Sequence, residues 1–193
     1  LLLDHRGAGE SEPATVTVGW DERKDVYAAY HYLRDLGYKD IGVLGISMGA
    51  AAAAYSLEEI KDYKFVILES CYDTLDNAWR NRLAMYSVPH FITYPMRWFA
   101  ALQMGVRAKY LEPVKFMPYC KVPILIVAGD DEPELKTSET KSLYDQCASP
   151  MKEIHFFRGG HHENFLRRFP DEYHHVVEAF LKKVYAQAVA EAA

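Results

Sequence analysis

The first residues in this sequence that could do chemistry are a serine and the glycines on either side of it. Gly45-Ile46-Ser47-Met48-Gly49 matches the pattern G-x-S-x-G, which holds a nucleophilic serine on a sharp turn between a strand and a helix. The glycines leave room for a strained backbone and for a closely packed helix. The pattern therefore predicts that Ser47 is a nucleophile.

The segments around Ser47 predict the strand and the helix that such a turn requires. Residues 41–46 form a short apolar run, which is typical of a buried strand, and the alanines at 50–54 favour a helix. The N-terminus of that helix would help to hold an oxyanion through its free N–H groups and its dipole.

Further apolar runs alternate with helical patterns along the chain. Runs typical of buried strands lie at 65–68, 124–128 and 154–157. Apolar residues recur at helical spacing at 21–36, 138–147 and 171–186. This alternation predicts the α/β class, with a mostly parallel sheet flanked by helices in a single domain over residues 1–193.

One stretch interrupts the alternation. Residues 77–119 are rich in aromatic residues and methionine, and they predict a helical insertion. Such residues serve in ordinary helix packing, but they also suit a cap or lid that lines an apolar pocket over an active site. Both interpretations are open at this point.

The chain as a whole resembles the α/β-hydrolase superfamily from its fourth strand onward. The loop at residues 4–11, DHRGAGES, resembles the D-x-R-G-x-G-x-S loop of that superfamily, and Ser47 then matches its nucleophile. A dinucleotide cradle is the alternative for this loop, but Glu12 stands where a third glycine is needed. Leu1-Leu2-Leu3 looks like the end of a strand, so we expect upstream strands to lie outside this sequence.

The resemblance also implies a base and an acid, in the chain order serine, acid, histidine. His161 follows Arg158-Gly159-Gly160 after the last predicted strand and resembles the superfamily's catalytic histidine. A metal site is the alternative, because His161, His162 and Glu163 are adjacent, but H-E-x-x-H spacing is absent from the sequence. We expect no metal.

The acid is expected in the acidic loop that follows the predicted strand at 124–128. Counting forward from Gly129 favours Glu132 as the acid, and counting back from Pro133 favours Asp131. Asp130 fits less well, and at least two of these three carboxylates are ordinary loop charges. The resemblance further implies that the backbone N–H of Met48 is one oxyanion donor and that the second donor lies upstream of Leu1.

These residues predict a serine hydrolase that cleaves a carboxylic ester or related acyl bond. His161 would take the proton of Ser47, which attacks the carbonyl of a small-molecule acyl substrate to form an acyl-enzyme, and water completes the reaction without a cofactor. The alternatives are a thioesterase or peptidase of the same fold, or a binding scaffold without catalysis.

Composition limits the partners and the compartment. The 22 Lys and Arg against 27 Asp and Glu give a net charge of −5 over mixed-sign segments, which predicts no nucleic-acid partner and no anionic membrane surface as a partner. The sequence holds no apolar run of the roughly 20 residues that span a membrane. Three widely spaced cysteines favour buried free thiols, and hence the cytoplasm.

Overall fold

Four parallel strands form the central sheet in the computed structural model, which describes residues 1–89, 91, 94–106 and 110–191. The strands lie in the order β1-β2-β3-β4, and each neighbouring pair is parallel. Their bounds are β1 (Val43–Ile46), β2 (Val66–Glu69), β3 (Ile124–Gly129) and β4 (Lys152–Phe157). All strands therefore end at the same edge of the sheet.

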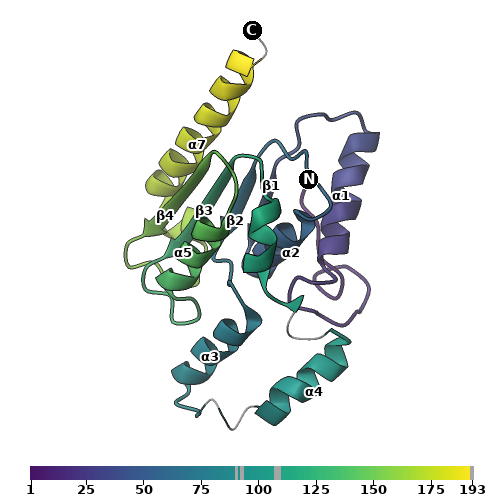
Figure 1. Ribbon diagram of the computed structural model, residues 1–193, viewed down its shortest axis with the longest axis vertical. Coiled ribbons are helices and arrows are strands. Elements are labelled where there is room, and N and C mark those ends of the chain that lie inside the picture. The colour runs from purple at the N-terminus through teal and green to yellow at the C-terminus, as the bar shows by residue number, and fades with distance from the viewer. Residues whose placement is uncertain (90, 92–93, 107–109, 192–193) are drawn as a thin grey trace.

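Helices cover both faces of this sheet (Figure 1). One face packs against α1 (Arg23–Asp35), α2 (Met48–Ser56), η3 (Pro113–Tyr119) and α5 (Thr137–Gln146). The other face packs against α6 (Phe165–Arg168) and α7 (Pro170–Glu191). The predicted fold class, a parallel sheet flanked by helices, is confirmed.

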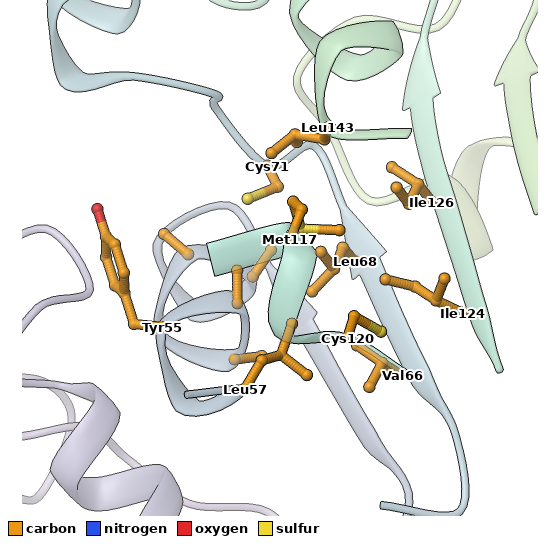
Figure 2. Packing of buried hydrophobic residues seen from close by; sticks show 14 of the residues in the cluster. Tyr55, Leu57, Val66, Leu68, Cys71, Met117, Cys120, Ile124, Ile126 and Leu143 are labelled. Carbon is orange, nitrogen blue, oxygen red and sulfur yellow. The ribbon is translucent and has the colours of Figure 1, made fainter. Parts of the chain in front are cut away.

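Side chains alternate between the two faces because successive residues of a strand point to opposite sides. On the face that carries α2, Val66 and Leu68 of β2 pack with Ile124 and Ile126 of β3 (Figure 2). Ile67 of β2 points to the opposite face and packs under α7. Both strands are buried throughout, which explains why the sequence showed them as continuous apolar runs.

The helix after Ser47 is packed entirely within the core. Every residue from Ala50 to Ser56 is buried, and the alanine side chains allow α2 to lie close to β1 and β2. Ser56 donates its hydroxyl hydrogen to the carbonyl oxygen of Ala53, so this polar group is satisfied inside the core. The position of Ser47 is thus fixed by a helix that has little freedom to move.

The N-terminal segment does not form the strand that the sequence predicted. Leu1, Leu2 and Leu3 are exposed by 69%, 99% and 40%, and the structure places them in irregular backbone. Within the described residues they pair with no other strand, and a strand needs such a partner for its backbone groups. The loop that follows is anchored to α1, because Arg6 contacts the carboxylate of Asp25 at 2.7 Å.

Helices lie between β2 and β3 in the described residues, where the sequence predicted a helical insertion over 77–119. They include α3 (Leu75–Met85), α4 (Tyr94–Met104) and η3. Residues 90, 92–93 and 107–109 of this interval lie outside the described residues. Figure 1 shows α3 and α4 standing away from the sheet, on the side where the strands end.

No helix in the described part of the chain is both long enough and apolar enough to cross a membrane.

Candidate active site

Ser47 lies on a sharp turn between β1 and α2. Its backbone has φ 53° and ψ −113°, a conformation that costs a non-glycine residue on the order of 1–3 kcal/mol. The turn is held on both sides: the N–H of Ser47 donates to the carbonyl oxygen of Glu69 at 2.8 Å, and the N–H of Ala51 donates to the carbonyl oxygen of Ser47 at 3.1 Å. This geometry presents the serine hydroxyl above the end of the sheet.

The two glycines of the G-x-S-x-G pattern have different environments. A Cβ atom on Gly45 would overlap the backbone of Gly49 and Ala50, so the approach of α2 to β1 requires a glycine there. At Gly49 the nearest atom to an added Cβ would be Nε2 of His5, at 3.6 Å. Only the first glycine is therefore demanded by packing.

His162 contacts the hydroxyl of Ser47. Its Nε2 lies 2.9 Å from Oγ of Ser47, and its Nδ1 lies 2.7 Å from Oε2 of Glu132. An ionised carboxylate can only accept hydrogen bonds, so Nδ1 donates to Glu132 and the free Nε2 accepts from Ser47. The hydrogen bond to Glu132 raises the pKa of His162, although partial burial opposes that shift.

Glu132 is buried, and its two carboxylate oxygens have separate partners. Oε1 accepts hydrogen bonds from the hydroxyl of Ser70 at 2.8 Å and from the backbone N–H of Gly129 at 2.7 Å. Oε2 is left for His162. A chain of hydrogen bonds therefore runs from Ser70 through Glu132 and His162 to Ser47.

The structure separates His161 and Asp131 from Ser47. His161 points outward: its side chain is 57% exposed, and its Nδ1 lies 2.6 Å from the carbonyl oxygen of Asp131. The carboxylate of Asp131 is itself 73% exposed. Asp130 accepts a hydrogen bond from the backbone N–H of Gly159 and so braces the loop. The structure thus brings His162, and not the predicted His161, within hydrogen-bonding distance of Ser47.

The turn after β4 explains this shift by one residue. Gly159 has φ 69°, the N–H of Gly160 donates back to the carbonyl oxygen of Phe157, and the N–H of Asp131 donates to the carbonyl oxygen of Gly160. This turn directs His161 to solvent and the next ring over the end of the sheet. Because the two histidines are adjacent, the sequence alone does not indicate which ring points toward Ser47.

Sequence reasoning also missed two polar residues at the end of β2, Ser70 and Glu69. Glu69 is 1% exposed, and its Oε2 accepts a hydrogen bond from the hydroxyl of Tyr173 at 3.0 Å. Burial raises the pKa of Glu69, and the nearby charge of Glu132 acts in the same direction. Glu69 thus ties the end of β2 to α7. The available signal in the sequence was that two polar residues, Glu69 and Ser70, directly follow the apolar residues of this strand.

Met48, the predicted oxyanion donor, is the first residue of α2. The first N–H groups of a helix have no partner within the helix, so the amide of Met48 is free to donate to a bound group. For metal binding, within the described residues no three His, Cys, Asp or Glu side chains converge in a way that could hold an ion.

A hollow of about 450 Å³ lies between β1 and the N-terminal residues 1–5 and reaches Ser47. Its walls include Leu1, Leu3, Leu44 and Ile46, and the last two are each 47% exposed. A smaller cleft on the other side of the serine is lined by Ser70, His162 and their neighbours. The cleft at Ser70 and His162 leaves space beside the hydroxyl.

The parallel sheet, the strained serine turn after β1 and the histidine and carboxylate that follow later strands define an α/β-hydrolase. Residues 17–165 match the family described as "Serine hydrolase (FSH1)". The chain belongs to this serine hydrolase family.

The chain is also similar to a protein of Bacillus subtilis. The chain is 27% identical over 187 residues to the uncharacterized protein YqkD of Bacillus subtilis (strain 168); the match covers 94% of this chain and 61% of YqkD. It therefore spans less than two thirds of the length of that relative.

Solved structures give the same fold. The Pyrococcus furiosus esterase Pf2001 is 26% identical, with a TM-score of 0.73 over 93% of this chain and 68% of the esterase. MGS-M2, an α/β-hydrolase enzyme from a deep-sea metagenome library of the Medee basin, is 17% identical with a TM-score of 0.64, over 93% of this chain and 78% of MGS-M2. The second likeness concerns the fold alone.

Proposed function

We propose that this chain carries the catalytic site of a serine esterase, in which Ser47 is the nucleophile, His162 the base and Glu132 the acid. The single observation that supports this most is the position of His162, whose two ring nitrogens lie within hydrogen-bonding distance of Ser47 and Glu132 at 2.9 and 2.7 Å. A nucleophile, a base and a group that orients the base are the parts that acyl transfer needs.

In the proposed reaction, Nε2 of His162 takes the hydroxyl proton as Oγ of Ser47 attacks the carbonyl carbon of the ester. The ion pair with Glu132 stabilises the imidazolium that forms. The imidazolium then gives its proton to the leaving alcohol, and an acyl-enzyme on Ser47 remains. Water, deprotonated by His162, attacks the acyl carbon; the bond to Oγ breaks, the imidazolium returns the proton to Ser47, and the acid is released.

The tetrahedral intermediate needs donors for its oxyanion. The backbone N–H of Met48 is proposed as one of them, because it is the first amide of α2 and follows the nucleophile directly. A second donor is expected from a loop upstream of Leu1. The loss of one such donor costs about 10²- to 10³-fold in rate.

The proposed substrate is a small, uncharged ester. This choice is supported by the aromatic and methionine residues of the segment at 77–119 and by the 26% identity to the Pyrococcus furiosus esterase. We also propose that the segment at 77–119 forms a cap above the site, since α3 and α4 lie on the side where the strands end (Figure 1). The proposed chemistry uses no cofactor. The three cysteines are buried free thiols, which supports the cytoplasm as the compartment.

A fluorophosphonate probe tests the proposal, because it phosphonylates only an activated serine. We expect stoichiometric labelling of Ser47, located by peptide mapping, and no labelling of Ser47→Ala. Hydrolysis of p-nitrophenyl esters by the labelled and unlabelled protein would then report on turnover. A folded chain that the probe leaves unlabelled would support the alternative, a binding scaffold without catalysis.

A further inference from the structure

Glu69, the last residue of β2, contacts two parts of the candidate site through different atoms. Its backbone carbonyl oxygen accepts a hydrogen bond from the N–H of Ser47 at 2.8 Å, at the turn that presents the hydroxyl. Its side-chain Oε2 accepts one from the hydroxyl of Tyr173 at 3.0 Å, and the same carboxylate accepts one from the backbone N–H of Phe165. Glu69 therefore joins the serine turn to the beginning of α6 and to α7.

The loop that carries His162 is short and is held at both ends. At one end, the carbonyl oxygen of Gly160 accepts a hydrogen bond from the N–H of Asp131 at 3.1 Å. At the other end, Phe165 begins α6 and donates its N–H to Glu69. Only residues 161–164 lie between these anchors. Because each residue extends a chain by at most about 3.6 Å, the position of His162 depends on both of them.

The side chain of Glu69 lies on the far side of the sheet end from the substrate cleft. Residues two apart in a strand point to the same face, so Glu69 lies on the side of Ile67, which packs under α7. Glu69 is 1% exposed, and the cleft is lined instead by Ser70, His162 and their neighbours. Its carboxylate thus acts on the site only by placing other groups.

Stability alone does not explain a carboxyl group at this position. Burial raises the pKa of Glu69, and the charge of Glu132 acts in the same direction, whereas the hydrogen bonds from Tyr173 and Phe165 oppose the shift. When a buried hydrogen-bonded pair is replaced by apolar groups of the same shape, the change in stability is often close to neutral. What the carboxylate adds to an apolar side chain is directed contact with two separate segments.

We propose that Glu69 is a positioning residue, whose backbone holds the serine turn while its side chain holds the end of the loop that carries His162. The inference rests on the proposed function, in which His162 is the base. The distance of 2.9 Å between Nε2 of His162 and Oγ of Ser47 then depends on the contacts of Glu69. A misplacement of about 1 Å in such a pair costs about 10²-fold in rate.

Two substitutions at Glu69 break the contact or preserve it. Glu69→Leu removes the acceptor for Phe165 and Tyr173, so kcat for a p-nitrophenyl ester should fall about 30- to 100-fold. KM should change by less than about twofold, because Glu69 does not line the cleft. In Glu69→Gln the amide oxygen still accepts from Phe165 and the amide nitrogen donates to the oxygen of Tyr173. This variant should lose no more than about threefold in kcat.

A double variant separates a loss of position from a loss of stability. Glu69→Leu leaves the buried hydroxyl of Tyr173 without its acceptor, which should lower the urea midpoint. Adding Tyr173→Phe removes that hydroxyl and keeps the ring, which stacks on Phe157 with centroids 6.0 Å apart. The double variant should therefore recover part of the midpoint and none of the kcat. If the single variant does not fold, the double variant takes its place in the comparison.

Val184→Ala is the matched control for stability. Val184 is buried in the same hydrophobic cluster as Phe165 and Tyr173, about three turns of α7 beyond Tyr173. The smaller side chain should lower the urea midpoint and leave both kcat and KM unchanged.

The pKa of His162, measured by NMR titration of its ring protons, reports its position without turnover. The contact with Glu132 raises this pKa above 6.5 in the unmodified protein. The pKa should remain raised in Glu69→Gln and should return toward 6.5 in the double variant, where the loop no longer holds His162 against Glu132. This measurement stands even if the chain hydrolyses no ester, so failure of the proposed function and failure of the inference are distinguishable.

Three results would overturn the inference. One is a kcat of the double variant within about threefold of the unmodified enzyme. Another is a kcat that follows the urea midpoint across all variants, Val184→Ala included, which would leave Glu69 with a structural role only. The third, which also applies to a chain without esterase activity, is an unchanged pKa of His162 in the double variant.

Discussion

The hydroxyl of Ser70 donates a hydrogen bond to Oε1 of Glu132 at 2.8 Å, while the other oxygen of the same carboxylate contacts His162. Ser70 lines the cleft beside Ser47, but its hydroxyl donates to Glu132, so it acts through that carboxylate as a positioning residue. Its hydrogen bond draws negative charge toward Oε1 and fixes the rotation of the carboxylate.

Ser70→Ala should therefore lower kcat/KM for a p-nitrophenyl ester about tenfold, the loss expected for one hydrogen bond to a charged group. More charge would remain on Oε2, so the acid limb of the pH profile should move to higher pH. Ser56→Ala is the control, because Ser56 is also buried and hydrogen-bonded but lies outside the site. A variant that loses thermal stability while its pH profile stays unchanged would leave Ser70 with a structural role only.

The two adjacent histidines make a direct test of the site. His162→Ala should reduce the rates of fluorophosphonate labelling and ester hydrolysis by at least about 10³-fold, because the base is lost. His161→Ala should remain within about threefold of the unmodified protein, since an exposed side chain outside the site contributes little. Single-turnover kinetics on both variants measures these rates. A larger loss of rate in His161→Ala than in His162→Ala would show that His161 is the base.

The two carboxylates that the sequence left open give an analogous pair. Glu132→Gln keeps the shape of the side chain but allows the amide to favour the wrong tautomer of His162, so kcat should fall by about 10²- to 10⁴-fold. Asp131→Asn should have little effect, because that carboxylate is 73% exposed and contacts only the exposed His161. The expectation fails if steady-state assays show the larger loss at Asp131.

The pH profile of the unmodified enzyme follows from the pKa of His162, which the contact with Glu132 raises above its ordinary value of 6.5. A base must be neutral, so kcat/KM should fall as the pH decreases through that raised pKa, and the midpoint of the acid limb should lie above 6.5. In Glu132→Gln the midpoint should move down, opposite to the shift expected for Ser70→Ala. An acid limb well below 6.5 in the unmodified enzyme would contradict the observed contact.

What the sequence predicted well depends on local patterns. The turn at Ser47 was recognisable because an apolar run, a G-x-S-x-G pattern and an alanine-rich segment follow one another directly. The strands β2 and β3 were recognisable because both are buried on both faces and are therefore apolar throughout. Leu1-Leu2-Leu3 has the same apolar character, but the described residues offer it no neighbouring strand.

What the sequence could not predict depends on contacts between distant residues. Ser70 and Glu132 are separated by 62 positions, and His162 and Ser47 by 115. Which of two neighbouring histidines faces inward is decided by a turn at Gly159-Gly160 whose hydrogen bonds reach back to β4 and across to Asp131. Counting residues from a motif cannot resolve a shift of one position in such a loop.

The last prediction concerns the stability of the serine turn and uses its two glycines as a matched pair. Gly45→Ala places a methyl group against the backbone of Gly49 and Ala50. To relieve this overlap, α2 would have to shift away from β1, and its buried side chains would lose their packing in the core. We expect it to lower the free energy of unfolding by about 1–3 kcal/mol, as overpacking does.

Gly49→Ala adds the same methyl group inside α2, where the nearest atom is 3.6 Å away. It should leave the free energy of unfolding unchanged or raise it by up to about 1 kcal/mol, because alanine favours a helix more than glycine does. Urea denaturation measures both changes in the free energy of unfolding, and an unchanged m-value shows that a shift of the midpoint reflects stability. Equal midpoints for the two variants would show that the close approach of α2 to β1 does not require a glycine at position 45.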